Sequence, residues 1–377
     1  MIDQGQDIFI FLLLLTAASI LRLVSSDTDD FDTLQETMAT MKAPQFDECG
    51  GPEKLYIGDV ARPEPGDDEI LVKVFSSAIN RADTLQLAGS YKSPPGANPI
   101  LGLEAAGEVV RLGAGCSQWK LGDRVALLAP GGGNAEYVVV NEGHVMPIPS
   151  HVTMEEAGGL PEVWLTAYQL LHFVGHVKQG DRVLIHGGGS GVGTAAVQLV
   201  CLAGAEPIVT AGTKEKLDMA KSLGAVAGFN YKEVDFAEKV LEFTESKGVN
   251  LILDCVGGSH WEKNLRTIAT EGTWVVYGLL GGASVEGAIL GGLLRKRATI
   301  VGTTLRPRSI QYKTDLVSAF TENALPYFGT KLKTITDRVF SLDEIADAYR
   351  HMLANKNIGK ILLRVHQEKP STDHSEL

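Results

Sequence analysis

A glycine-rich loop is the stretch of this chain best suited to chemistry. Residues 183–196 read VLIHGGGSGVGTAA. An apolar strand that ends in small residues and leads directly into a helix would point unpaired backbone N–H groups, and the positive end of the helix, at a pyrophosphate. Ser190 takes the middle glycine position of the G-x-G-x-x-G pattern if Gly188 is the first, and a plain strand–helix turn is the alternative interpretation. The loop residues we expect on a cofactor are Gly188, Ser190, Gly191, Val192 and Gly193.

The residues after the next predicted strand indicate which dinucleotide binds. Enzymes that use NAD place an Asp or Glu about 20 residues beyond the loop, where it binds the ribose hydroxyls. Residues 210–216 read TAGTKEK, so the strand tip carries no acid and two lysines follow Gly212. A lysine can bind a 2′-phosphate as a point charge. We therefore predict NADPH as the cofactor, against the alternative that Lys214 and Lys216 only lie on a solvated helix face.

The spacing of cysteine and histidine argues against a metal site. The four cysteines lie far apart with no C-x-x-C pair, which is typical of small apolar residues in or near a core. His172 and His176 are one helical turn apart, but the adjacent Glu of an H-E-x-x-H motif is missing. We therefore expect no metal, and packing or surface roles for both histidines.

The elements that would position the loop form two patterns. From Leu55 to about residue 160, short β segments are separated by glycines and prolines, which predicts a β-rich domain. Beyond Pro161, strands alternate with helices, which predicts a doubly wound parallel sheet. The expected strands are 181–186, 207–210, 251–255 and 273–277, and the expected helices are 162–174, 193–202, 214–223 and 261–269. A helix over 345–353 and a strand over 360–365 follow.

Length and charge limit the function classes. A chain of 377 residues has room for two domains, taking about 150 residues per domain as a guide. The net charge of −12 opposes nucleic-acid binding, because phosphate neutralisation needs a basic face. Bound NADPH would need a local basic pocket instead.

Several segments together resemble the medium-chain dehydrogenase/reductase superfamily, and within it the zeta-crystallin-like quinone oxidoreductase branch. The resemblance covers nearly everything from Met41 to Val365. Beside the glycine loop, it is carried by residues 80–83 (NRAD), 102–107 (GLEAAG), 122–125 (GDRV), 228–232 (GFNYK), 250–255 (NLILDC) and 354–361 (ANKNIGKI).

The resemblance implies a Rossmann sheet inserted into a β-rich, GroES-like catalytic domain. The implied divisions are an N-terminal extension at 1–40, catalytic residues at 41–160, a Rossmann domain at 161–305, and a return to the catalytic domain with a tail at 306–377. Zinc-dependent members carry a Cys and a His where this chain has Asn80 and Leu103, so zinc is not expected.

The resemblance also assigns site residues. Tyr91, Asn80 and Ser190 are expected at the catalytic cleft, where the Tyr91 phenol would orient or help to protonate the acceptor, unless it only packs its loop. Further cofactor contacts are expected from Gly212, Lys216, Tyr231, Gly278 and Lys360.

We predict a zinc-independent NADPH:quinone oxidoreductase that acts on a small-molecule quinone or conjugated carbonyl. One alternative is NADPH-dependent reduction of an enone, and another is a non-catalytic NADPH-binding protein of the crystallin or vesicle-membrane kind. The resemblance also implies a homodimer through the last Rossmann strand, expected over 299–305.

The two ends of the chain support two interpretations of location. Residues 8–21 carry no charge, and a signal or anchor segment over 8–24, with a cleavage point after Ser26, would direct the chain to the endoplasmic reticulum. The last four residues, HSEL, resemble a retention signal with Ser in place of Asp. Against this, Asp3 and Asp7 precede the apolar run and no Asn-x-Ser/Thr acceptor occurs, so a cytoplasmic protein with an extended start is the alternative.

Overall fold

The computed structural model describes residues 39–287 and 289–367. The apolar run at 8–24 and the C-terminal HSEL therefore lie outside the described residues, and the location of the protein stays a prediction. Within the described ranges, no helix is long and apolar enough to cross a membrane. Strands β1 (Thr40–Gln45) and β2 (Tyr56–Ala61) form a small two-stranded sheet.

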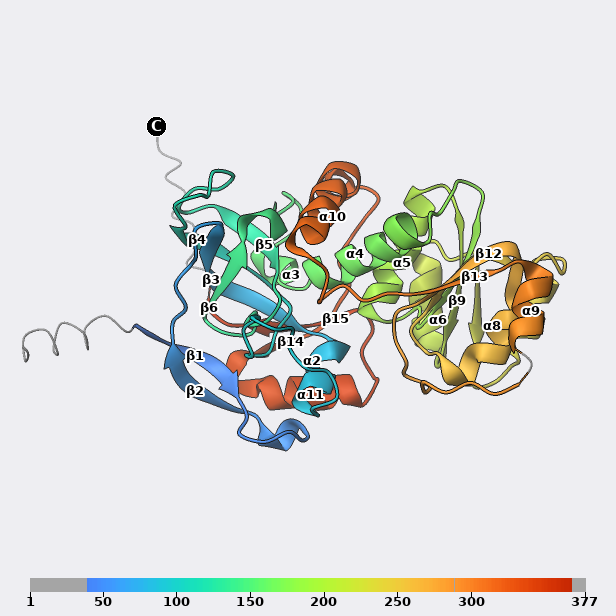
Figure 1. Cartoon of the computed structure of the whole chain (residues 1–377), viewed down its shortest axis with the longest axis horizontal. Coiled ribbons are helices and arrows are strands. Elements are labelled where there is room, and N and C mark those ends of the chain that lie inside the picture. The colour runs from blue at the N-terminus through green and yellow to red at the C-terminus, as the bar shows by residue number, and fades with distance from the viewer. Residues whose placement is uncertain (1–38, 288, 368–377) are drawn as a thin grey trace, which may run out of the picture. The chain divides into compact units, whose positions relative to one another are not determined.

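A six-stranded parallel sheet forms the Rossmann half (Figure 1). Its strand order is β10-β9-β8-β11-β12-β13, with β13 at one edge. The strands are β8 (Arg182–His186), β9 (Glu206–Ala211), β10 (Ala227–Asn230), β11 (Val249–Asp254), β12 (Ile268–Val276) and β13 (Thr299–Gly302). The doubly wound sheet predicted from the alternating pattern is confirmed.

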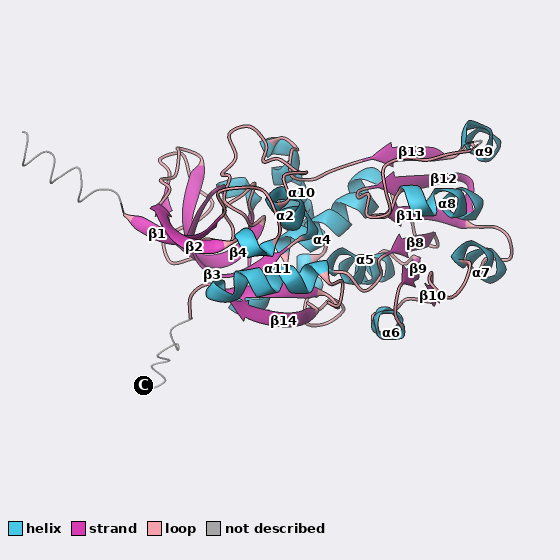
Figure 2. Ribbon diagram, turned by 90° about the horizontal axis from the view of Figure 1, so that it is seen from below, coloured by secondary structure: helices cyan, strands magenta, loops and turns pink. Residues whose placement is uncertain are grey.

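Helices cover both faces of this sheet. Figure 2 shows α5 and α6 on one face and α7 and α8 on the other. The helices are α5 (Gly191–Leu202), α6 (Lys214–Ser222), α7 (Phe236–Phe243), α8 (Trp261–Thr267) and α9 (Ile289–Lys296). Ile185 packs into the core cluster on one face and Leu184 into the cluster on the other. Burial on both faces explains why the strands read as continuous apolar runs.

Strands from both halves of the sequence build the second sheet. Its order is β14-β15-β3-β4-β5-β7, and β6 also pairs with β3. The strands are β3 (Glu69–Ile79), β4 (Glu104–Leu112), β5 (Arg124–Leu128), β6 (Tyr137–Asn141), β7 (Val145–Pro147), β14 (Thr336–Ser341) and β15 (Lys360–Arg364). The accompanying helices are α2 (Arg81–Leu87), α3 (Met154–Ala157), α4 (Pro161–Tyr168), α10 (Ile310–Asn323) and α11 (Ile345–Leu353). The Rossmann sheet is thus inserted into a β-rich domain, although the predicted boundaries at 160 and 305 stay predictions.

Several expected elements differ from the structure in their bounds or type. The helix expected over 261–269 ends at Thr267, because Ile268 already pairs with Val249 as a strand residue. The last Rossmann strand ends at Gly302 rather than residue 305. The helix expected over 162–174 is α-helical only to Tyr168 and continues as a π-helical segment, Gln169–Val174.

Candidate active site

The glycine loop has free donors where an anion would approach. Ser190 caps α5, and its Oγ accepts a hydrogen bond from the Gly193 N–H at 3.0 Å. The Thr194 N–H donates to the Ser190 carbonyl. The N–H groups of Gly191 and Val192, by contrast, have no hydrogen-bond acceptor among the described residues. A Cβ on Gly193 would lie 2.2 Å from the Gly187 carbonyl oxygen, which leaves room only for glycine. The start of α5 therefore fits a pyrophosphate.

A basic group lies beside the tip of β9. The Lys216 side chain lies against Gly189, where a Cβ would come within 2.7 Å of it, and its Nζ donates to the Asn355 carbonyl at 2.6 Å. Burial lowers the pKa of Lys216, and the nearby Lys232 lowers it further. Gly212 is in close contact with the Tyr231 hydroxyl, since an added Cβ would lie 2.9 Å from it. These residues fit a phosphate at the predicted ribose position.

Gly278 lies between the ends of two neighbouring strands. It follows β12, and a Cβ there would lie 3.0 Å from the carbonyl oxygen of Cys255, which follows β11. Because ligands of open α/β sheets bind outside the carboxyl ends of the strands, Gly278 is on the expected cofactor side. Its predicted contact stays a prediction.

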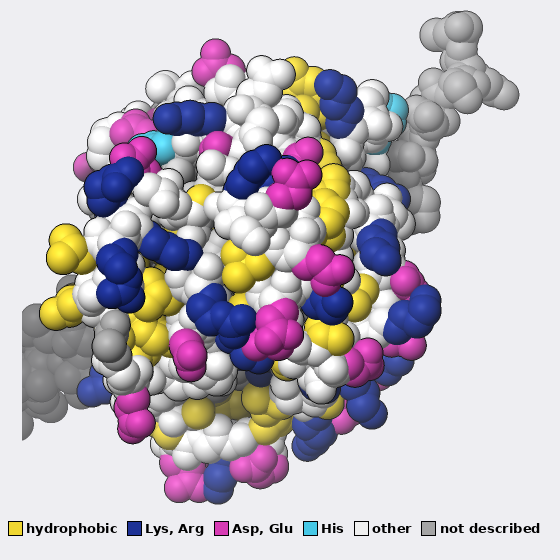
Figure 3. All heavy atoms as spheres, turned by 90° about the vertical axis from the view of Figure 1, so that its right-hand side faces the viewer, with side chains coloured by type: hydrophobic (Ala, Val, Ile, Leu, Met, Phe, Trp, Pro, Cys, Tyr) yellow, Lys and Arg dark blue, Asp and Glu magenta, His cyan; other side chains and the backbone are white. Residues whose placement is uncertain are grey.

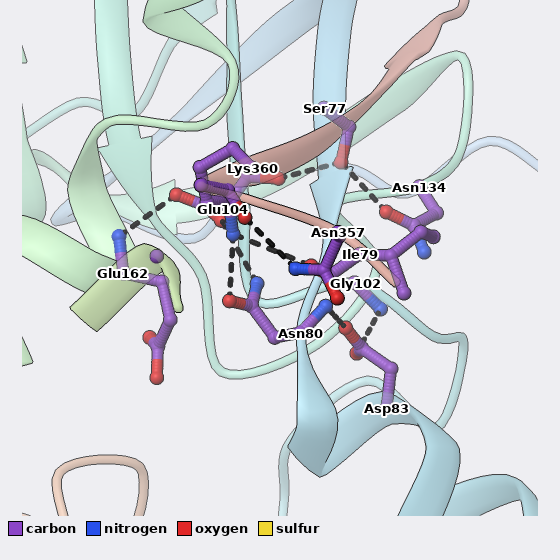
Figure 4. Close-up of polar contacts among 12 residues, drawn as sticks. Ser77, Ile79, Asn80, Asp83, Gly102, Glu104, Asn134, Glu162, Asn357 and Lys360 are labelled. Atoms are coloured by element: carbon purple, nitrogen blue, oxygen red, sulfur yellow. Dashed lines mark hydrogen bonds and ion pairs between the residues drawn. The ribbon is translucent and has the colours of Figure 1, made fainter. Parts of the chain in front are cut away.

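Three residues from distant segments meet in a buried polar cluster (Figure 4). The Lys360 Nζ lies 2.7 Å from Glu104 Oε1 and 2.7 Å from Asn80 Oδ1. Asn80 Nδ2 donates to the same Glu104 oxygen at 2.8 Å. The side chain of Glu104 is fully buried and that of Lys360 is 8% exposed. All the polar atoms of the Asn80 side chain are thus engaged in hydrogen bonds with Lys360 and Glu104. Asn80 is therefore better placed to hold these two residues in position than to contact an acceptor.

The glycine loop and this cluster are joined by the C-terminal segment before β15. Gly359 donates from its N–H to the Gly189 carbonyl at 2.9 Å and pairs with Ser190 as an isolated bridge. Lys360 is the next residue, and its ammonium group donates hydrogen bonds to Glu104 and Asn80. The structure therefore places Lys360 next to the loop with its charge already paired, and its predicted contact with the cofactor stays a prediction.

Tyr91 lies in a second polar group. Its ring lies under the guanidinium of Arg306, with 5.6 Å from Cζ to the ring centroid. Arg306 is buried and held by hydrogen bonds to Gln86 Oε1, Ser93 Oγ and the Pro130 carbonyl. Burial raises the pKa of Tyr91, and the Glu162 carboxyl raises it further. Tyr91 therefore keeps its proton at neutral pH and can donate a hydrogen bond.

Sequence reasoning missed Glu104, Glu162 and Arg306. Glu104 stands inside the GLEAAG segment, so its presence in a family motif was a usable signal. Glu162 and Arg306 stand in no motif that marks them, and only the fold brings Arg306 over the Tyr91 ring.

Comparison with known proteins places the chain in a family. The alcohol dehydrogenase GroES-like domain matches residues 66–150, and the zinc-binding dehydrogenase family matches residues 191–322. The quinone oxidoreductase of Pseudomonas aeruginosa is 31% identical over 329 residues, which are 85% of this chain and 99% of that protein. The chain belongs to the quinone oxidoreductase branch of the medium-chain dehydrogenase/reductase superfamily.

Solved structures agree with this placement. The Escherichia coli quinone oxidoreductase complexed with NADPH has a TM-score of 0.76 and 28% identity, covering 87% of this chain and all of that chain. The CurK enoyl reductase has a TM-score of 0.76 and 27% identity, covering 86% of this chain and 99% of its own. The chain also matches a phenolphthiocerol/phthiocerol polyketide synthase of Mycobacterium tuberculosis at 30% identity over 327 residues, but it spans only 15% of that protein's length.

The name of the second family raises the question of zinc, and the residues present do not fit it. The cluster offers an amide at Asn80 and one carboxylate at Glu104, and the residue before Glu104 in the sequence is the apolar Leu103. The Lys360 ammonium already lies 2.7 Å from that carboxylate and would repel a metal ion. In the described part of the chain, no three His, Cys, Asp or Glu residues lie together as metal ligands. These residues therefore do not fit a zinc ion.

Proposed function

We propose that this chain is an NADPH-dependent oxidoreductase whose acceptor is a quinone. The observation that carries the proposal is the start of α5, where two backbone N–H groups have no acceptor among the described residues and Lys216 lies against the same loop. The E. coli relative complexed with NADPH, and the quinone oxidoreductases to which the chain is similar, support the choice of cofactor and acceptor.

Different residues of the chain would bind different parts of NADPH and of the quinone. The N–H groups of Gly191 and Val192 hold the pyrophosphate, and Lys216 with Tyr231 holds the 2′-phosphate. NADPH supplies a hydride when it is bound. The Tyr91 phenol donates a hydrogen bond to a quinone oxygen, and the Arg306 guanidinium over the ring keeps it in place.

The experiment is NADPH oxidation by the full-length chain with an ortho-quinone, with NADH as the parallel donor. We expect turnover with NADPH to exceed turnover with NADH by at least 10-fold, since a lysine–phosphate contact is a charge-assisted bond worth about 1.5–3 kcal/mol. Tight binding of NADPH without turnover of any acceptor would overturn the enzyme proposal and leave a non-catalytic NADPH-binding protein.

A second candidate function is reduction of the carbon–carbon double bond of an enone. Similarity to the CurK enoyl reductase favours it. Both reactions would use the same cofactor site. Only the molecule that is reduced, a quinone or an enone, distinguishes them. Turnover of an α,β-unsaturated ketone but not of the quinone would establish the second candidate.

We also propose that the protein pairs as a homodimer through β13. This strand is the edge of the Rossmann sheet, so one side of its backbone is unpaired within the sheet. Nearby α9 exposes Leu290 and Leu294, each 80% accessible, and Figure 3 shows hydrophobic side chains exposed among charged ones on this end of the molecule. Sedimentation should give twice the chain mass for the wild type and a single chain for Leu294→Glu with Ile300→Pro.

A further inference from the structure

Arg306 is a buried cation that binds only neutral groups. It is 6% exposed and lies shortly after β13, in the segment that leads to α10. Its guanidinium donates to Gln86 Oε1 at 2.8 Å, to Ser93 Oγ at 3.1 Å and to the Pro130 carbonyl at 2.8 Å. In the part of the chain that the structure describes, it forms no ion pair with a carboxylate. Because buried charges are normally paired with an opposite charge, this position suits a negatively charged ligand atom.

The guanidinium also has donors to spare. Arginine carries five N–H groups, one on Nε and two on each Nη. The three hydrogen bonds use one N–H on each nitrogen, which leaves one N–H on each Nη without an acceptor among the described residues. Hydrogen bonds from a cation to an anionic oxygen are about twice as strong as those between neutral groups. Arg306 is therefore suited to an anionic oxygen by its charge and by its two remaining donors.

The Tyr91 phenol lies against the same cation. The Arg306 Cζ is 5.6 Å from the centroid of the Tyr91 ring. Tyr91 is only partly buried, and no described residue forms a hydrogen bond with its hydroxyl group. An accessible O–H donor and an enclosed positive charge are thus in contact through one ring. A ligand oxygen that accepts a hydrogen bond from Tyr91 would lie near a charge that solvent screens poorly.

Hydrogen bonds to α2 hold both residues in place. Gln86 of α2 is 7% exposed, and while its Oε1 accepts from Arg306, its Nε2 donates to the Pro99 carbonyl at 2.7 Å. The Tyr91 N–H donates to another carbonyl of α2 at 3.1 Å. Both ends of the loop over 91–99 are therefore tied to this helix. Donors that are fixed before charge develops stabilise that charge most strongly, because nothing has to reorganise during the reaction.

We propose that Arg306 and the Tyr91 hydroxyl together stabilise the negative charge that develops on the acceptor oxygen during reduction. The inference rests on the proposed function. A hydride leaves the nicotinamide with its electron pair, so a bond to hydrogen breaks there and forms on the quinone. The cofactor is oxidised, and the quinone is reduced to the hydroquinone monoanion. Its negative oxygen accepts a hydrogen bond from Tyr91 beside the Arg306 charge, and the second proton of the hydroquinone comes from solvent.

The first test needs no turnover. It uses 4-nitrophenol in place of the reduced acceptor, with NADP⁺ in the cofactor site, because only the phenolate form absorbs visible light. Wild type should favour the phenolate over the neutral phenol about 10-fold more than water does, as expected for a hydrogen bond to a charged group. In Arg306→Gln this preference should be lost. Wild type that binds only the neutral phenol, or fails to bind the phenolate, would overturn the proposal.

Two substitutions of Gln86 separate the charge of Arg306 from its position. Gln86→Glu keeps an oxygen where Oε1 accepts from Arg306 at 2.8 Å, but it adds a negative charge that neutralises the guanidinium. Gln86→Met removes this hydrogen bond and leaves the positive charge. We expect Gln86→Glu to lose the phenolate preference and Gln86→Met to keep most of it. The opposite result would show that Arg306 only holds the loop in place.

Turnover of substituted benzoquinones provides the second test. Arg306→Gln should lower kcat/KM by about 100-fold, as does the loss of a donor to a developing oxyanion. The loss should shrink for quinones whose reduced oxygen is less basic, since less charge then needs to be stabilised. A purely structural role would lower kcat/KM equally for every quinone. Arg308→Gln is the matched control, because the Arg308 guanidinium lies 4.6 Å from the centroid of another ring, that of Tyr312, and it should match wild type.

The outcomes separate this inference from the proposed function. Quinone turnover by wild type without a phenolate preference, or with an equal loss for every quinone in Arg306→Gln, overturns the role of Arg306 and leaves the quinone reductase proposal standing. Turnover of enones alone overturns the quinone proposal. The phenolate measurement then still decides the role of Arg306, since an enone also gains negative charge on its oxygen. No turnover of either acceptor by wild type overturns both proposals.

Discussion

Substitution of Lys360 by Met tests the buried cluster most directly. The Met side chain keeps most of the apolar stem that lies against Gly191 but removes the ammonium from Glu104. At 2.7 Å and an effective dielectric constant of 20, the attraction lost is about 6 kcal/mol. Glu104 retains the hydrogen bonds from Asn80 Nδ2 and the Glu162 N–H, which offset part of that loss. We expect the free energy of unfolding to fall by about 3–5 kcal/mol, as when a buried pair loses one partner.

The assay is urea unfolding followed by tryptophan fluorescence, with the midpoint compared at equal slope. Lys360→Met with Glu104→Gln removes both charges and should recover most of the loss, because no buried charge is then left unpaired. Lys214→Met, which removes the exposed ion pair with Asp218, is the control and should leave the midpoint unchanged. A loss below about 1 kcal/mol for Lys360→Met, or a double variant no more stable than the single one, would refute the reasoning.

Three further predictions follow from other residues. Gly193→Ala places a Cβ 2.2 Å from a backbone oxygen and should weaken NADPH binding at least 10-fold by calorimetry, whereas Gly302→Ala, with open space around the added Cβ, should not. Lys216→Met should weaken NADPH binding by about 10–100-fold and leave NADH binding unchanged, and equal losses would contradict the phosphate assignment. Burial lowers the pKa of His144 from 6.5 to about 4, so the folded state binds a proton less readily than the unfolded state. The free energy of unfolding should therefore be highest above pH 6.5 and should decline as the pH falls toward 4. In His144→Gln the dependence of this free energy on pH should become flatter. An unchanged dependence would show that His144 is not its cause.

The elements of the Rossmann half were predictable because their signals are local. The β8 strand, the glycine loop and α5 are encoded within residues 182–202, where apolar residues, small residues and a capping Ser190 follow one another. The helix over 345–353 was predicted to the residue for the same reason. The ends of α8 and β13 were not, because strand pairing decided them: Ile268 pairs with Val249, and the partner strand β12 runs only to Val276.

Some residues of the candidate site were also predictable from local sequence, whereas others were brought together only by the fold. The sequence by itself determined the glycine loop, the lysines beyond β9 and the lack of a zinc ligand at Asn80 and Leu103, since each depends on a residue type at a given place in a motif. Only the tertiary structure decided that Lys360 pairs with Glu104 and that Arg306 lies over the Tyr91 ring. Lys360 and Glu104 lie 256 positions apart, and they meet because β15 pairs with β3 and β3 pairs with β4. The Glu104 side chain is fully buried and that of Lys360 is 8% exposed, so each charge needs the other as a partner, and no local pattern of residues encodes burial of that kind.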